Sequence, residues 1–209
     1  YLERLAAEYA RDPSIDLIYC NMELFGSRTG LFHRSRRDRD LGLSILMGAF
    51  INRWQGSATS AISLRAPLFR RLIDLPPEQA REWKSRPDDC LVMGADVLGA
   101  HKYYIGEPLV LHREHDDNAL LNYGKSALTG MRYVVRNERM LEHYRKKMGV
   151  TPRWLRLAKQ EFKTKHPPSF RELLDYSRLL GESPLGWWKR LAHRASMLRH
   201  YLRHRFSAR

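Results

Sequence analysis

Residues 82–118 read EWKSRPDDCLVMGADVLGAHKYYIGEPLVLHREHDDN, and this stretch decides the expected fold. The acid pair Asp88-Asp89 opens an apolar run that is expected to be a helix to about Ala100, with one of the two acids as its N-cap. Residues 103–105 and 108–111 then read as two short strands. A helix followed by strands of this kind indicates an α/β protein with a mixed sheet.

The preceding sequence continues the alternation. Residues 15–25 (IDLIYCNMELF) form an apolar run typical of a strand covered on both sides, residues 31–32 could return as its hairpin partner, and residues 59–64 predict another strand. Helices are expected over 1–10, 41–51 and 67–73. Residues 76–87 should form an extended loop around Trp83. The charge run RSRRDRD at 34–40 is interpreted as a solvated loop, with a phosphate clamp as the alternative.

The net charge of +14 is concentrated in the second half of the chain. Residues 1–124 carry 16 Lys and Arg against 17 Asp and Glu, whereas residues 125–209 carry 21 against 6. Helices are expected over 123–148, 152–164, 169–180 and 184–206. The sequence therefore predicts an α/β unit over 1–122 and an all-helical basic region over 123–209. A charge excess confined to one region indicates an anionic partner, such as lipid headgroups or nucleic acid.

The last expected helix is amphipathic. Apolar side chains recur every three or four residues and share one stripe: Trp187, Leu191, Ala195, Leu198, Leu202 and Phe206. Two interpretations stay open, because the stripe of residues 184–206 could lie in an anionic membrane interface or pack on the rest of the protein. We interpret His193, His200 and His204 as part of the polar face.

Other features set limits on the class of protein. The two cysteines, Cys20 and Cys90, have no zinc-site or disulfide spacing and are expected to be buried thiols. The longest nearly continuous apolar run, 41–51, is too short to span a bilayer. Because Tyr1 already lies in a predicted helix, we expect the chain to be a piece of a longer protein, located in the cytoplasm or peripherally at the inner face of the membrane.

The acid pair is the first candidate for chemistry. A carboxylate at a helix N-terminus is held as an anion and could act as a general base toward a hydroxyl group. The structural alternative is that one Asp caps the helix and the other is solvated. Trp83, on the loop before the pair, could form an acceptor-side wall on which a sugar stacks, or could simply pack in the core.

The end of the last strand is the second candidate. Arg113 and His115 lie two residues apart and therefore point to the same face of a strand, where both could bind a diphosphate and His115 could ligate a metal. Asn118 follows in a turn. The alternative is that Arg113 pairs with Asp116 or Asp117 and that Asn118 only begins the next turn.

Taken in order, these elements resemble the second half of the catalytic domain of an inverting family 2 glycosyltransferase of the GT-A type, over about residues 1–120. The resemblance implies that Asp88-Asp89 supplies the catalytic base, with Asp89 the better match. It also assigns Arg113, His115 and Asn118 to a Tyr-Arg-x-His-x-x-Asn pattern in which His112 replaces the Tyr.

The implied reaction transfers a sugar from a nucleotide diphosphate sugar to an acceptor hydroxyl, in envelope polysaccharide or glycolipid synthesis. Members of that family hold Mg or Mn on an Asp-x-Asp motif in a nucleotide-binding half that this chain does not contain, so the chain alone is expected to be inactive. The competing hypothesis is a nucleic-acid-binding or membrane-docking helical scaffold without catalysis.

Overall fold

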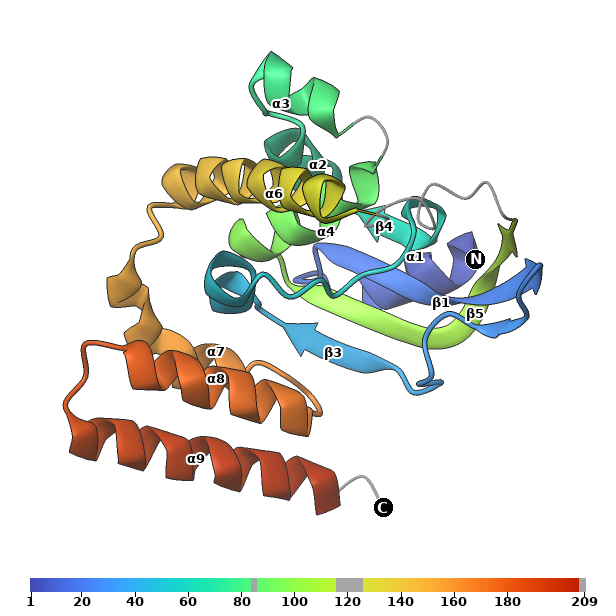
Figure 1. Cartoon of the computed structure of the whole chain (residues 1–209). Coiled ribbons are helices and arrows are strands. Elements are labelled where there is room, and N and C mark those ends of the chain that lie inside the picture. Colours follow the sequence, from blue (N-terminus) through green and yellow to red (C-terminus); the bar gives the residue numbers. More distant parts are fainter. Residues whose placement is uncertain (84–85, 116–125, 207–209) are drawn as a thin grey trace.

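The structure is a computed structural model that describes residues 1–83, 86–115 and 126–206. It is a mixed α/β protein in which helices flank a five-stranded sheet, and a helical C-terminal region follows (Figure 1). The expected fold class is confirmed at this level.

Two long parallel strands form the centre of the sheet. β1 (Leu17–Gly26) pairs with β5 (Lys102–Glu114) along its whole length. Three shorter strands are antiparallel to this pair: β2 (Gly30–Leu31) and β4 (Ile62–Leu64) pair with β1, and β3 (Arg39–Gly42) pairs with β5. The run of buried residues from Leu17 to Met22 confirms that β1 is covered on both sides.

Alternate side chains of β1 enter two different cores. Leu17 and Tyr19 belong to the cluster under the α4 and α6 helices described below, whereas Ile18, Cys20 and Met22 belong to a cluster with Leu5. This follows from the two-residue period of a strand, which sends successive side chains to opposite faces. Leu5 lies in α1 (Leu2–Arg11), so α1 covers the face of the sheet opposite α4.

One strand prediction and one helix prediction need correction. The runs at 103–105 and 108–111 belong to one strand, β5. The pairing of β5 with β1 shifts register between Cys20 and Asn21 and again between Asn21 and Met22, and these shifts accommodate the Gly106–Pro108 interruption. The helix expected over 41–51 begins later, because residues 39–42 form β3 and only Met47–Ile51 forms a π-helix. Both cysteines are free and buried, as predicted.

Besides α1, four α-helices of the described chain precede residue 149. α2 (Ala66–Leu72) was predicted, while α3 (Pro77–Glu82) occupies part of the expected extended loop. α4 (Pro87–Val97) begins with Pro87 at its first position and has Arg86 as its N-cap, so the expectation that an Asp caps this helix was wrong. α6 (Ala127–Met148) starts at a Ser126 capping box and packs along α4.

The remaining helices form a separate bundle. A 3₁₀ turn (Pro152–Leu157) leads into α7 (Ala158–Phe162), α8 (Phe170–Glu182) and α9 (Trp187–Phe206). Their buried apolar residues make their own cluster, which reaches the rest of the protein through Leu46 and Met47.

Lys165 holds this bundle against the sheet. Its side chain is fully buried, and its Nζ donates to the backbone oxygens of Leu41 and Leu43 at 2.7 and 2.8 Å and to the Ser44 Oγ at 2.9 Å. Burial lowers the pKa of this ammonium, while Glu172 and other nearby carboxylates favour its charged form. Leu41 lies in β3 and the other two acceptors follow it directly, so the bundle is attached by polar contacts to the end of this strand and the segment after it.

Glu161 adds a second buried polar contact at the same junction. Its carboxylate accepts hydrogen bonds from the Leu46 backbone N–H at 3.0 Å and from the Tyr176 hydroxyl at 2.7 Å. Arg39 of β3 forms an ion pair with Glu172 of α8. The charge run at 34–40 is therefore a solvated loop only up to residue 38, as Arg39 is drawn into the junction.

Replacing Lys165 should be strongly destabilising. In Lys165→Met the backbone oxygens of Leu41 and Leu43 and the neighbouring carboxylates lose their buried partner, and such a loss typically costs about 3–5 kcal/mol of unfolding free energy. Urea unfolding would measure it. The matched control is Lys163→Met, because Lys163 is exposed and should change stability by less than about 0.5 kcal/mol. Equal stability of the two variants would contradict the role given to Lys165.

Glu161 should make stability depend on pH. Burial raises the pKa of Glu161 to about 7, so the folded protein holds a proton that the unfolded chain releases above its ordinary pKa of about 4.3. Stability should therefore fall by an amount on the order of a few kcal/mol as pH rises from about 4.5 to about 7. Glu161→Gln cannot titrate and should flatten the profile in this window. Parallel profiles for the two proteins would place the titrating group elsewhere.

Candidate functional site

The acid pair lies in the first turn of α4, but its two members differ in exposure. Asp88 is half-buried, whereas Asp89 is fully buried. The Asp89 carboxylate is therefore not open to an acceptor from solvent. Asp88 is the member of the pair that solvent reaches.

Asp89 is enclosed by two polar partners. The Arg86 Nε lies 2.8 Å from its Oδ2, and the Tyr133 hydroxyl of α6 donates to the same carboxylate at 3.1 Å. Burial nevertheless raises the pKa of Asp89, and the charge of Asp88 adds to the increase, while Arg86 opposes it. Burial, together with the Asp89 charge, also raises the pKa of Tyr133 to about 12. This environment stabilises the protonated carboxyl relative to water, as is common for functional carboxyl groups.

Trp83 packs in the core beside the pair. Its side chain is only 3% exposed, the Arg136 guanidinium lies 4.2 Å from its ring centroid, and the Tyr133 ring meets it edge-on at 6.3 Å. The packing interpretation is confirmed, and a sugar-stacking platform at Trp83 is excluded in this conformation because its ring is covered. Trp83 instead supports the same face of α6 that covers Asp89.

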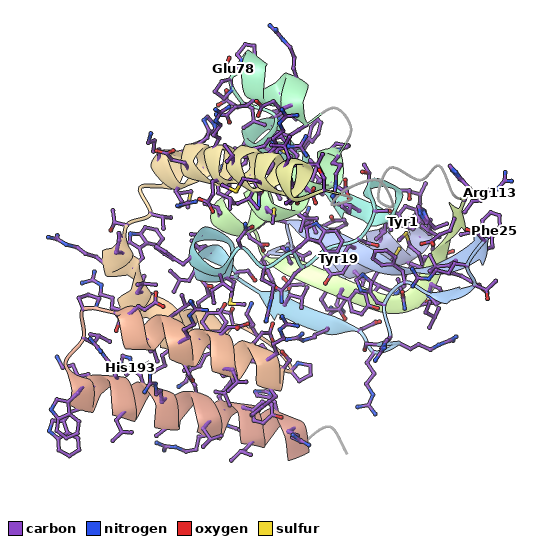
Figure 2. All side chains as sticks on the ribbon, in the orientation of Figure 1. Tyr1, Tyr19, Phe25, Glu78, Arg113 and His193 are labelled. Atoms are coloured by element: carbon purple, nitrogen blue, oxygen red, sulfur yellow. The ribbon has the colours of Figure 1, made fainter. Side chains whose placement is uncertain are left out.

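Arg113 and His115 lie away from the acid pair. The chain reverses direction at Gly99. Counted from this turn, Asp89 lies about 12 Å away along α4, whereas Arg113 lies about 36 Å away along β5. Figure 2 shows Arg113 beside Phe25 at the far tip of the sheet, in agreement with the strand register. His115 is exposed beyond this tip, and Asn118 lies outside the described residues.

A polar cavity of about 690 Å³ lies between the segment after the π-helix and α8. Its walls include three guanidinium groups, one carboxylate, one indole and one amide, from Arg53, Arg171, Arg178, Asp175, Trp54 and Gln55. Arg53 and Asp175 form an ion pair across it. Burial and the nearby Arg171 charge lower the pKa of Arg53, while Asp175 opposes the shift. Three guanidinium groups against one carboxylate would favour an anionic ligand there.

The acid pair and one rim residue of the cavity both contact α6. Tyr133 contacts Asp89, and Asn137, one turn later, donates to the Asn52 side chain on the cavity rim at 2.9 Å. The two contacts are therefore about 6 Å apart along the helix. Gly56 permits the close approach of the cavity segment to α4, because a Cβ atom there would lie 2.3 Å from Val92.

Sequence reasoning missed these residues. Tyr133 and Asn137 stand four apart in a predicted helix, and Arg171, Asp175 and Arg178 also recur at helical spacing. Each spacing was visible as a shared helix face. Nothing in the sequence indicated that the segment at 52–55 would meet α8.

Imidazole groups gather at a third position. His166, before α8, meets His200 and His204 of α9, and one ligand atom from each lies within 4.8 Å of the others. These two α9 histidines therefore face the bundle, contrary to the expected polar face. Three imidazoles suit zinc, copper or nickel, but Lys163, Arg199 and Arg203 line the adjacent hollow and oppose a cation there. In the described part of the chain this is the one such group, and His115 is not in it.

Asp89→Asn should leave the fold intact. Burial raises the pKa of Asp89, so its surroundings tolerate an uncharged side chain better than water does, and the Asn side-chain oxygen can still accept from Tyr133. Because Arg86 is partly exposed, we expect the unfolding free energy to fall by less than the roughly 3–5 kcal/mol typical of a buried ion pair that loses one partner, measured by urea titration near neutral pH. Asp89→Leu, which removes both polar atoms, should cost more. A large loss in the Asn variant would show that the Arg86 ion pair stabilises the fold.

The acid pair with Arg86 and Tyr133, and the cavity that Arg53 and Asp175 span, together make up the candidate site. The strand-end residues Arg113 and His115 occupy a separate position. Comparisons of the chain with protein-family models, curated proteins and solved structures give no match.

Proposed function

We propose that this chain supplies the acceptor side of an inverting glycosyltransferase that uses a nucleotide diphosphate sugar, in envelope polysaccharide or glycolipid synthesis. The observation that carries the proposal is that the acid pair, through Asp89, and the polar cavity, through its rim residue Asn52, contact α6 one helical turn apart. The cavity volume of about 690 Å³ is in the range of small-molecule sites, and its arginines suit an anionic ligand.

The order of elements supports the same proposal. β1, β4, the acid-initiated α4 and β5 follow one another as the family resemblance implies, and β1, β4 and β5 join one sheet. The cytoplasmic face of a membrane would be the place of reaction, since sugar acceptors in such pathways are carried there.

The chemistry requires a carboxylate near the acceptor. A sugar hydroxyl attacks the anomeric carbon, its oxygen forms the new glycosidic bond, and its proton passes to the carboxylate. The bond from the anomeric carbon to the diphosphate breaks, and the nucleoside diphosphate leaves with the electron pair. Asp88 is assigned as the base because solvent reaches it, and Asp89 positions it by fixing the first turn of α4.

The divalent metal implied by the resemblance does not fit the described residues. Mg and Mn prefer oxygen ligands, whereas the one clustered group of three potential ligands in the described chain is made of imidazoles on the far side of β3. No step is therefore assigned to a metal held by this chain. The diphosphate-binding role of Arg113, His115 and Asn118, and the metal role of His115, stay predictions.

The test is acceptor-dependent release of nucleoside diphosphate by the full-length protein. A panel of nucleotide diphosphate sugars would be supplied one at a time, with a lipid and polysaccharide extract of the source cells as acceptor. Asp88→Asn should lower the rate about 10²–10⁴-fold, as loss of a general base commonly does, with donor binding nearly unchanged. Asp89→Asn should have a smaller effect.

Glu78→Gln is the matched control, because Glu78 lies in the first turn of the neighbouring α3 and is exposed. It should keep the wild-type rate. A larger loss for Asp89→Asn than for Asp88→Asn, at unchanged stability, would return the base to Asp89. Retention of more than a tenth of the rate by both Asp variants, or no acceptor-dependent release with any donor, would refute the proposal.

A further inference from the structure

α9 packs on the bundle through one face only. Met197 is fully buried and Tyr201 is 7% exposed, and both belong to the core of the C-terminal bundle. His193 lies on the same side, facing α7 and α8 (Figure 2). Because the packing face is occupied by these residues, the apolar stripe noted in the sequence points elsewhere.

The described side chains of the stripe are exposed. The exposed fractions are 63% for Trp187, 53% for Leu191, 46% for Leu198 and 40% for Leu202. Trp188 is 66% exposed and stacks on Trp187 with ring centroids 3.7 Å apart. The interpretation in which the stripe packs on the rest of the protein is therefore wrong. Single exposed apolar residues are ordinary, but a contiguous stripe on one helix marks a binding surface.

A neighbouring helix extends the apolar surface. Phe170 and Leu174, one turn apart on α8, are 56% and 54% exposed. The Phe170 ring lies 6.0 Å from that of Tyr201, which borders the stripe on α9. Figure 1 shows α9 as the outermost element of its side of the molecule, with α8 between it and the sheet.

Basic residues flank the stripe on both sides. At 100° per residue, Arg199 and Arg203 fall along one edge, and Arg194 and Arg205 fall along the other. The twenty residues of α9 include no Asp or Glu. An apolar stripe between two basic edges is the pattern of a helix that lies in the plane of an anionic lipid surface.

We propose that α9 docks the protein on an anionic membrane, with its axis parallel to the surface. The leucines and the paired indoles would enter the headgroup boundary, where tryptophan is favoured, and the flanking Lys and Arg would meet lipid phosphates. No helix within the described residues is long and apolar enough to cross a bilayer. This inference is independent of the proposed enzyme activity.

Charge complementarity selects a lipid surface over the other partners. A nucleic acid offers phosphates to the basic edges but would leave the leucines between them facing a charged backbone. A second copy of this chain would bring two basic edges together, and like charges would repel. An anionic bilayer offers negative charge and an apolar layer at the same surface.

Vesicle flotation of the whole chain tests the proposal. Binding is expected to vesicles of phosphatidylcholine with phosphatidylglycerol at low salt, to weaken at high salt, and to be much lower with phosphatidylcholine alone. Arg199→Gln with Arg203→Gln should weaken binding about 30-fold, which corresponds to about 1 kcal/mol for each basic residue. Leu191→Ser with Leu198→Ser should weaken it at least tenfold.

The matched control removes two charges from another helix. Arg139→Gln with Lys146→Gln changes exposed α6 residues and should leave vesicle binding within about twofold of wild type. Quenching of tryptophan fluorescence by brominated lipid chains should disappear in Trp187→Phe with Trp188→Phe. Circular dichroism of each variant would confirm that α9 remains folded.

Three results would overturn the proposal. These are no binding to anionic vesicles at low salt, equal binding to neutral vesicles, and equal loss in the α6 control. Binding to mixed-sequence RNA or DNA that the Arg199/Arg203 pair abolishes and the Leu191/Leu198 pair leaves unchanged, without vesicle binding, would assign the surface to nucleic acid instead.

Discussion

The buried ammonium of Lys165 is the constraint on which the arrangement of the C-terminal half depends. A charge removed from water must be surrounded by acceptors, and Leu41 at the end of β3 supplies one, while Leu43 and Ser44 directly after it supply the others. Meeting this requirement places the segment before α8 against the sheet. α8 and then α9 follow as outer layers, so polar contacts fix where the basic helices lie relative to the α/β unit.

Much of the fold follows from local sequence, and the exceptions have physical causes. The apolar run of β1 and the amphipathic period of α9 are strong signals. β3 has only four residues, RDLG, and becomes a strand because β5 pairs with it from 60 residues away. The Gly106–Pro108 interruption suggested two strands, since the register shifts that join them into one are a property of the partner strand.

The candidate site was predictable only in part. The acid pair could be found because a proline and two acids before an apolar run mark a helix start. The burial of Asp89 could not, because Tyr133 covers it from 44 positions later, and the cavity walls Arg53 and Asp175 are 122 positions apart. In α9 the period indicated a stripe but not its direction. Met197, Tyr201 and the histidines form a second regular face, and that one packs.

An isolated β-bridge between Asp40 and His166 covers one edge of the sheet. β3 is a terminal strand, and such strands present unpaired backbone groups that can recruit another chain. Asp40 exchanges both backbone hydrogen bonds with His166, and the Leu43 N–H donates to the Thr164 hydroxyl. The helical region thus blocks pairing of β3 with a strand of another molecule. Ending the chain before Thr164 would remove these contacts and leave an aggregation-prone edge strand on the side of the sheet farthest from β2.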